Sequence, residues 1–441
     1  MASDEGRITG MAVCGYKSIG EKQAIEIRPL TILAGANSSG KSSIMQPLLL
    51  LKQTLESPFD PGPLLLDGPN VRVTSAEQLL TRVPGCAPAD TFSVELNRGV
   101  KTLELTFGKG QGASLDVLSM RYSDREGEGY LVTQATADAE IRALLPKYVR
   151  DFLTILDGGG KRKVSWVVER DRCFLGFTPR GVSRRLKGTF PPGFRIFFSE
   201  RVGASIEEVI HLPGLRGNPE RTYKRTAVGP KFPGTFDAYA ASVIYDWQAH
   251  GESPARLGGI LEELGLTWKV KARPVDDTHV ELRVGRLPHA RQGGAGDLVN
   301  VADVGIGVSQ ALPVVVALLV ARRNQLVYLE QPEIHLHPRA QRQMARTLAN
   351  AAKRGVIVVA ETHSALIVRE IQTLVANGEL DSEIVKLHWF TRNATDGTTK
   401  ISSADLDQGG AYGSWPEDFD DVALASEKDY LDAVERPRGR Q

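Results

Sequence analysis

Hydrophobic residues near the start of the chain follow patterns that predict three strands and a helix. Residues 7–14 (RITGMAVC) and 23–27 (QAIEI) alternate apolar and polar side chains, which is typical of half-buried strands. Residues 30–34 (LTILA) form a continuous apolar run, as expected for a strand buried on both faces. After a glycine-containing loop, residues 44–56 combine dense apolar side chains with good helix formers. The predicted order is strand, turn, strand, strand, loop and helix.

Similar patterns return from about residue 300. Residues 305–320 are a glycine-punctuated loop that leads into an apolar helix, and residues 326–329 (LVYL) are a buried strand. An amphipathic helix follows at 339–353, and a second buried strand follows at 356–360 (VIVVA). Buried strands that alternate with helices indicate an α/β fold.

The middle of the chain is harder to interpret, and we expect it to form an inserted lobe of mixed α and β structure. Short strands are predicted at 92–96, 102–107 and 164–168, and helices at 137–156 (broken at Pro146), 236–247 and 254–264. Residues 142–231 carry 19 Lys and Arg against 8 Asp and Glu. The predicted divisions are 1–55 and 296–415 for the two halves of one α/β domain, 56–295 for the lobe, and 416–441 for an acidic tail.

Composition narrows the class of protein. The formal net charge is +1, so any attraction to nucleic acid must come from a local patch. The three cysteines are widely spaced, and the polar, acidic N-terminus is unlike a signal peptide. The longest apolar run, 311–321, is about half of the roughly 20 residues that a bilayer span needs. We therefore expect a soluble cytoplasmic protein with no membrane partner.

The strongest chemical signal is the loop at residues 35–42 (GANSSGKS), which fits the P-loop pattern between a buried strand and a helix. Glycines at both ends allow backbone N–H groups to surround a phosphate, and the helix N-terminus adds partial positive charge. Lys41 can reach the β- and γ-phosphates, and the Ser42 hydroxyl can ligate Mg²⁺. The sequence predicts an ATP and Mg²⁺ site built by Gly35, Asn37, Ser38, Ser39, Gly40, Lys41, Ser42 and Ser43.

A carboxylate for the metal should stand at the end of a neighbouring strand. The strand at 326–329 is followed by Glu330 and Gln331, and Glu330 is the predicted metal anchor beside Ser42. His335 and His337 further along this segment admit a zinc site, but two histidines without a third ligand favour a structured loop.

Two further motifs lie at ends of predicted elements. His363 follows the strand at 356–360, at the edge where α/β sheets bind ligands; it could contact a γ-phosphate or water, or simply cap the next helix. Residues 303–310 (DVGIGVSQ) place glycines and a serine at a helix N-terminus, which is a second surface suited to phosphate.

These motifs, in this order, resemble the ABC-type ATPase head shared by SMC proteins, RecF and the OLD (overcoming lysogenization defect) family. Residues 15–18 (GYKS) are similar to the turn that precedes the P-loop in this family, and the strings LEQPEIHLHP and ETHS look most like the OLD-like and AbiEii-like ATPases. Many of those are phage-defence components, such as Septu and PARIS. Residues 211–223 (HLPGLRGNPERTY), DVGIGVSQ and SWPEDFDD are similar to one subgroup.

The resemblance implies a head that dimerises with ATP held between the P-loop of one subunit and the signature motif of the other. Lys41 and Ser42 would grip the phosphates and Mg²⁺, and Glu330 would anchor the metal. His363 would be the switch histidine. The signature would comprise Gly305, Gly307, Ser309 and Gln310, although the usual Ser-Gly-Gly order is not kept.

One departure from the family pattern changes the expected chemistry. The family carries an Asp-Glu pair in which Glu polarises water, and here the pair is Glu330-Gln331. Because Gln331 cannot accept a proton, general-base assistance of roughly 10²–10⁴-fold would be missing. The sequence predicts slow hydrolysis and a switch rather than a motor.

The leading functional hypothesis is an ATPase that controls a partner effector, such as a nuclease, in phage defence. A DNA-binding ATPase of repair or chromosome maintenance, like RecF, is the alternative, with KRK at 161–163 and RRLK at 184–187 following phosphates. A scaffold that binds ATP without hydrolysing it is a third.

Overall fold

The computed structural model describes residues 6–85, 87–110, 115–123, 129–147, 149–151, 165–180, 195–196, 200–250, 254–287, 289, 296–413 and 428. A central six-stranded sheet organises them, in the order β10-β15-β16-β3-β17-β18. The first five strands of that order are parallel to their neighbours, and β18 runs antiparallel to β17. The strand bounds are β10 Ile210–Leu212, β15 Leu326–Glu330, β16 Ile357–Thr362, β3 Leu30–Gly35, β17 Val385–Arg392 and β18 Thr399–Ala404.

Alternate residues of the buried strands face two different cores. In β3, Ile32 belongs to one core, whereas Leu33 belongs to the other. The same alternation separates Leu329 from Tyr328 in β15. Since both faces of the sheet are covered, these strands are apolar almost throughout, as the sequence pattern indicates.

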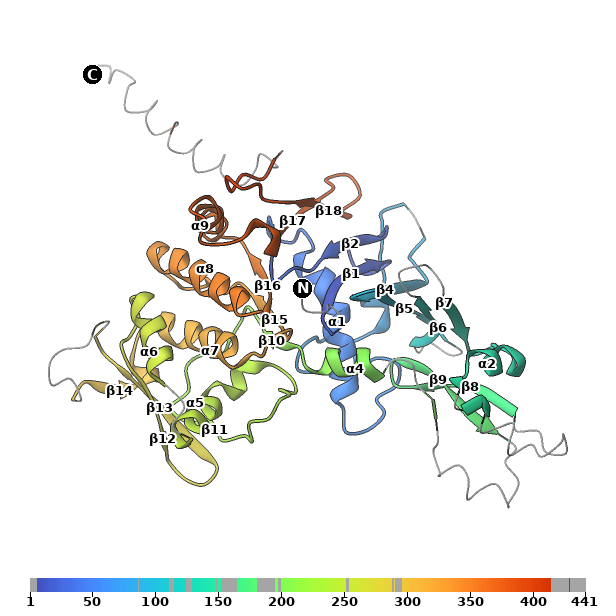
Figure 1. The fold of residues 1–441 in the computed structure, drawn as a ribbon, viewed down its shortest axis with the longest axis horizontal. Helices are drawn as coiled ribbons and strands as arrows, with labels where there is room; N and C mark the ends of the chain where they lie inside the picture. The colour runs from blue at the N-terminus through green and yellow to red at the C-terminus, as the bar shows by residue number, and fades with distance from the viewer. Residues whose placement is uncertain are drawn as a thin grey trace.

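Helices cover one face of the central sheet (Figure 1). The helices α7 (Ile306–Val320), α8 (Pro338–Lys353) and α9 (Ala365–Ala376) share the core on that side. Outside them lie α5 (Ala240–Ala249), α6 (Pro254–Glu263) and a small antiparallel sheet in the order β11-β13-β12, with β14 paired to β13. Its strands are β11 Tyr223–Lys224, β12 Val270–Pro274, β13 His279–Gly285 and β14 Leu298–Asn300.

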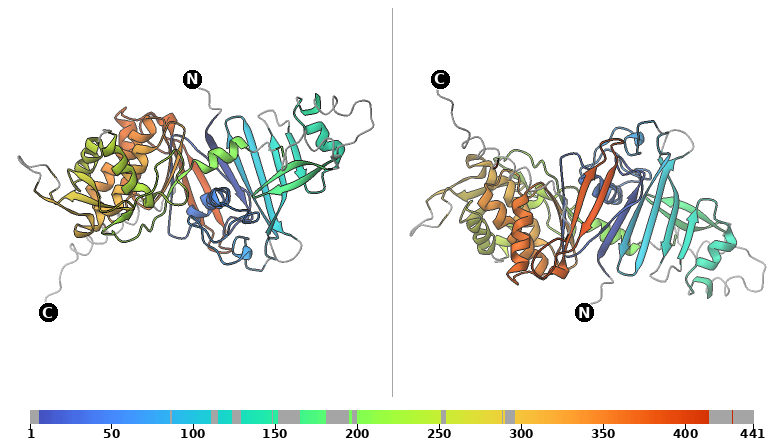
Figure 2. Two further views of the ribbon diagram at one scale, coloured as in Figure 1. Left: turned by 90° about the horizontal axis from the view of Figure 1, so that it is seen from below. Right: turned by 90° about the horizontal axis from the view of Figure 1, so that it is seen from above.

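Helix α1 (Lys41–Glu56) lies between the central sheet and a second six-stranded sheet, which is antiparallel and has the order β2-β1-β4-β5-β6-β7 (Figure 2). Apolar side chains of α1 meet both sheets in the second core, so α1 is buried on most of its circumference. The antiparallel strands are β1 Ile8–Cys14, β2 Gln23–Glu26, β4 Thr91–Arg98, β5 Lys101–Lys109, β6 Leu115–Ser123 and β7 Gly129–Thr133. Beyond them lie α2 (Asp138–Leu144) and the hairpin of β8 (Ser165–Asp171) and β9 (Phe174–Arg180), whereas α4 (Glu200–Glu207) packs beside α1.

Most predicted elements are present, with two adjustments. The helix predicted at 137–156 with a break at Pro146 is present as α2, which ends at Leu144, and as helical residues at 147 and 149–151, and residues 152–164 lie outside the described part. The segment 236–247 begins as a 3₁₀ turn at Phe236–Tyr239 and continues as α5. Residues of the segment 56–295 enter both large sheets, through β4–β7 and through β10. The acidic tail at 416–441 lies outside the described residues except for position 428.

Within the described residues, no helix is long and apolar enough to cross a membrane. Cys14 and Cys173 are free thiols, and Cys86 lies outside the described part. Burial raises the pKa of the Cys173 thiol, so this residue is an apolar core side chain rather than a reactive one.

His388 makes the stability of the fold depend on pH. This fully buried side chain of β17 bonds Ser403 Oγ and the Glu26 carbonyl, each at 2.8 Å, and burial lowers its pKa to about 4. Below the ordinary pKa of about 6.5, the unfolded chain takes up a proton here that the folded chain does not, so stability falls as pH falls from 6.5 towards 4. We expect a loss of about 2 kcal/mol from this residue between pH 7 and pH 5.

Urea unfolding of the wild type and of His388→Gln at the two pH values measures this contribution. The variant should be less stable at pH 7 and should lose less stability than the wild type on acidification. Equal losses in the two proteins would contradict the assignment.

Candidate functional site

The P-loop occupies the carboxyl end of β3, and its two outer glycines are required by sterics. Gly35 has φ +146°, and a Cβ there would lie 2.3 Å from the Phe390 carbonyl oxygen of β17. Gly40 has φ +99°, and a Cβ there would lie 2.2 Å from Thr399 Oγ1 of β18. The Thr399 hydroxyl also donates to the Ser39 carbonyl at 2.8 Å. The neighbouring strands therefore fix the loop before any ligand arrives.

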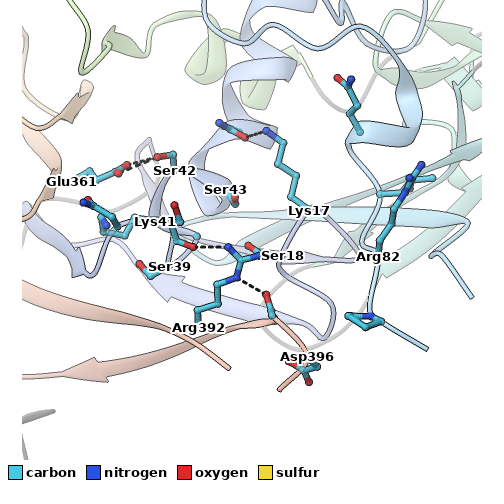
Figure 3. A pocket seen from close by; sticks show the side chains of 18 of the residues that line it. Lys17, Ser18, Ser39, Lys41, Ser42, Ser43, Arg82, Glu361, Arg392 and Asp396 are labelled. Carbon is cyan, nitrogen blue, oxygen red and sulfur yellow. Dashed lines mark hydrogen bonds between the residues drawn. The ribbon is translucent and has the colours of Figure 1, made fainter. Parts of the chain in front are cut away.

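A cavity of about 1000 Å³ opens over this loop (Figure 3). Seven of the eight residues predicted between positions 35 and 43 to bind the nucleotide line it, and Gln331 and His363 line it too. Other parts of its wall had no predicted role in nucleotide binding: Lys17, Ser18, Gln46, Glu77, Gln78, Leu80, Arg82, Pro84, Glu361, Arg392, Thr395, Asp396 and Gly397. Three of these, Lys17, Arg82 and Arg392, are cationic, and three, Glu77, Glu361 and Asp396, are acidic, so the wall beyond Lys41 carries charges of both signs.

Lys41 lies deep in the loop, where its ammonium donates to the carbonyls of Gly35 at 3.0 Å and Ala36 at 2.8 Å. Burial lowers the pKa of Lys41, and the nearby carboxylates of Glu361 and Glu333 oppose that shift. The hydroxyl of Ser39 is buried without a hydrogen-bond partner in the same loop. A cation and an unpaired donor inside a glycine cradle fit a phosphate group.

Glu361, at the end of β16, is the carboxylate nearest to the P-loop serine. The Ser42 hydroxyl lies 3.0 and 2.9 Å from its two oxygens, and Tyr328 donates to it at 2.9 Å (Figure 3). The side chain is only 5% exposed, and burial, reinforced by the Glu330 charge, raises its pKa. A hydroxyl beside a carboxylate is a donor set that Mg²⁺ accepts.

Glu330, the predicted metal anchor, stands beside Glu361 in the register of β15 and β16 but has other partners. Its carboxylate bonds His211 Nε2 at 3.1 Å and the Gly214 N–H at 3.1 Å. Burial alone would raise the pKa of Glu330, but these bonds hold it below its usual value. Glu330 does not line the cavity, so its role as metal anchor remains a prediction.

Gln331 and Glu333 follow in a tight turn. Gln331 has φ +46°, and its N–H donates to the Glu361 carbonyl at 2.8 Å. Glu333 accepts from the Thr362 hydroxyl at 2.7 Å and from the His363 N–H at 3.0 Å. Glu333 therefore orders the turn that carries His363, and burial raises its pKa.

His363 lines the cavity in its neutral form at pH 7. Burial and the charge of Lys41 lower its pKa, and a hydrogen bond to the Gly35 backbone opposes them. A neutral ring can both donate and accept a hydrogen bond.

The two histidines that admitted a zinc site lie in backbone turns and caps. His337 caps α8 by accepting from the Arg339 N–H, and His335 occupies a turn with φ +61°. The described residues contain no group of three metal-ligating side chains, so nothing in them supports the zinc alternative.

The predicted signature residues gather at the N-terminus of α7, away from the cavity of their own chain. Gly305, Gly307, Ser309 and Gln310 are absent from its lining. Ser309 donates to the Ile306 carbonyl at 2.9 Å. The Gln310 amide is buried and donates to the carbonyls of Arg216 at 3.1 Å and Gly217 at 3.2 Å, so its side chain already has partners.

The structure adds nothing to the DNA-binding alternative. Both basic runs that suggested it, 161–163 and 184–187, lie outside the described residues.

One protein-family model is similar to part of the chain. A family model described as "AAA domain, putative AbiEii toxin, Type IV TA system" matches residues 210–369, which run from β10 into α9. The comparison with curated proteins gave no match.

Three solved SMC heads are similar to the chain. An SMC head bound to the C-winged helix domain of ScpA shares 13% identity at a TM-score of 0.47, covering 91% of this chain and 98% of that one. The SMC head domain from Thermotoga maritima shares 12% at 0.40, covering 91% and 100%. An Smc head with an extended coiled coil, bound to the C-terminal domain of ScpA derived from Pyrococcus furiosus, shares 11% at 0.44, covering 98% and 100%. Because these TM-scores are below 0.5, the fold assignment rests on the strand order and the P-loop.

Fold and site together define a P-loop ATPase of α/β architecture, and the predicted fold class is confirmed. The family model adds that residues 210–369, which carry Glu330, Gln331 and His363, are similar to an AbiEii-like AAA domain.

Replacing Glu361 tests whether this carboxylate serves the metal. Glu361→Gln keeps the size but removes the charge beside Ser42, and a charged hydrogen bond contributes about 1.5–3 kcal/mol. We expect the gain in nucleotide affinity that Mg²⁺ provides to fall roughly 10- to 100-fold. Fluorescent-nucleotide titration with and without Mg²⁺ measures it, with Glu330→Gln as the comparison. An unchanged gain in Glu361→Gln, combined with a lost gain in Glu330→Gln, would assign the metal to Glu330 instead.

Proposed function

We propose that this chain is an ATP-dependent switch, in which two copies close on ATP and the closed dimer controls a partner effector. The observation that carries the proposal is that two surfaces suited to phosphate do not share a cavity in one chain. Lys41, Ser42 and Glu361 line it from their own chain, whereas the phosphate-suited N-terminus of α7 does not. A second copy could supply that surface, since a symmetric dimer uses both surfaces twice.

When bound, ATP would supply the phosphoanhydride bond that is broken, and Mg²⁺ would neutralise the charge that develops on the phosphates. Gln331 can orient a water molecule but cannot act as a base, and Glu333 is tied to Thr362 and His363 and does not line the cavity. Neutral His363 and the buried Glu361 are the remaining acceptors. Slow turnover and a long-lived ATP-bound state follow from this set.

The effector side of the proposal is supported by the family likeness alone. The matching family model is described as a putative toxin of a type IV toxin–antitoxin system. Together with the resemblance of the LEQPEIHLHP and ETHS strings to OLD-like ATPases, this description supports our proposal of a role in prokaryotic phage defence, with a nuclease as the proposed effector.

Substituting the missing base tests the switch. We expect Gln331→Glu to raise the rate of phosphate release by about 10²-fold, because it adds a general base beside the nucleotide. Lys41→Ala should abolish release in either background, since it removes the phosphate-binding cation. Steady-state phosphate release at saturating ATP measures both. A rate in Gln331→Glu equal to or below that of the wild type would contradict the proposed limit on turnover.

A further inference from the structure

A short segment that begins in β10 contacts both the carboxyl-end edge of the central sheet and α7 near its N-terminus. We call this segment, residues 211–217 (HLPGLRG), the connector. At its start, His211 and Gly214 hold the Glu330 carboxylate at 3.1 Å each. The other ring nitrogen of His211 bonds Asn70 at 2.9 Å, and the ring stacks on Tyr328, so the start of the connector is fixed.

Arg216 makes the link to α7. Its guanidinium donates to the Gln310 carbonyl of α7 at 3.2 Å and to the Glu330 carbonyl of β15 at 2.9 Å, and it lies 3.4 Å from the Gln331 carbonyl. The Gln310 amide returns two bonds to the backbone of the connector. A planar guanidinium fixes the direction of each bond, so the carbonyls of two separate elements are held at one spacing.

Burial makes this link difficult to break. Arg216 is 6% exposed, and burial lowers its pKa to about 10. Its hydrogen bonds go to carbonyls rather than to a carboxylate, because the Glu330 carboxylate is bonded to His211 and Gly214. Separating α7 from the Gln331 turn would therefore take a carbonyl partner away from a buried cation, which is costly. This cost favours movement of the two elements together.

The connector and the start of α7 each expose one large apolar side chain. Leu215 is 89% exposed, and Ile306, the first residue of α7, is 41% exposed. Glycines 214 and 217 flank the Leu215–Arg216 pair, and a Cβ at Gly217 or at Gly305 would meet no atom within 4 Å. The hydrogen bonds of Arg216 fix the turn that carries Leu215, so this exposed side chain is available to contact another protein surface.

We propose that the connector couples the nucleotide state at Gln331 to the partner-facing surface of the same subunit, with Arg216 as the positioning residue and Leu215 as a contact to the second copy. This inference rests on the proposed ATP-dependent dimer. In that dimer, each nucleotide site would combine the P-loop of one chain with α7 of the other. The connector would then couple the two sites, because Gln331 serves the nucleotide of its own chain and α7 serves that of the partner.

The test uses full-length Arg216→Gln and Leu215→Ser. The control is Arg221→Gln, which removes a neighbouring arginine that is 71% exposed and paired with Asp303 at 2.8 Å. For each protein we measure nucleotide affinity at concentrations where the chain is monomeric, ATP-dependent dimerisation by sedimentation, and the Hill coefficient of phosphate release. Thermal unfolding reports on folding.

We expect both connector variants to bind nucleotide within about twofold of the wild type and to dimerise at least tenfold more weakly. Arg216→Gln should also reduce the Hill coefficient to 1. Arg216→Lys, which keeps the cation, should restore part of the dimerisation, and Arg221→Gln should match the wild type.

A purely structural role predicts something different: nucleotide affinity and unfolding temperature would fall together in Arg216→Gln, with the Hill coefficient unchanged. That result, or wild-type dimerisation in both connector variants, would overturn the proposal. If Arg216→Gln does not fold, Arg216→Lys and Leu215→Ser decide the matter. A wild-type chain that stays monomeric with ATP would instead overturn the dimer itself, and the connector proposal with it.

Discussion

The parallel pairing of β3, β16 and β15 is the constraint on which the site depends. It brings three carboxyl ends to one edge of the sheet, so the P-loop, Glu361 and Glu330 stand side by side. The bond between Ser42 and Glu361 spans two of these strands and joins residues 319 positions apart. A shift of one residue in the register of β16 would turn Glu361 to the opposite face of the sheet and separate it from Ser42. The two cores on either side of the sheet prevent such a shift, because it would also exchange their side chains.

The sequence predicts the parts of this arrangement that are encoded locally. Residues 30–34, 326–329 and 356–360 are recognisable as strands because they are buried on both faces and therefore apolar throughout. Strand β17 escaped prediction because it contains Lys386 and His388 among its buried residues. These side chains are tolerated there because Asp405, Glu26 and Ser403 pair with them, and those partners are distant in the sequence or on another strand. The pairing of β4 with β1, which lies about 80 residues earlier in the chain, is likewise a long-range interaction that local sequence patterns do not encode.

The same distinction holds within the site. The P-loop could be identified because its chemistry lies in eight consecutive residues. Glu361 was visible in the ETHS string, but its closeness to Ser42 depends on β16, rather than β15, pairing with β3. The contacts of Arg216 could not be predicted either, since they join three elements that are separated in the sequence. The sequence therefore predicts the nucleotide as the ligand, and the structure shows that Glu361 is the carboxylate that contacts Ser42.

Closure of two copies on ATP is the central claim of this account, and sedimentation velocity of the wild-type chain tests it most directly. The chain would be examined without nucleotide, with ADP and Mg²⁺, and with ATP and Mg²⁺ under otherwise identical conditions. We predict that the mass doubles only in the condition with ATP and Mg²⁺, and that it returns to the mass of the monomer as the ATP is hydrolysed. The same mass in all three conditions would contradict the claim.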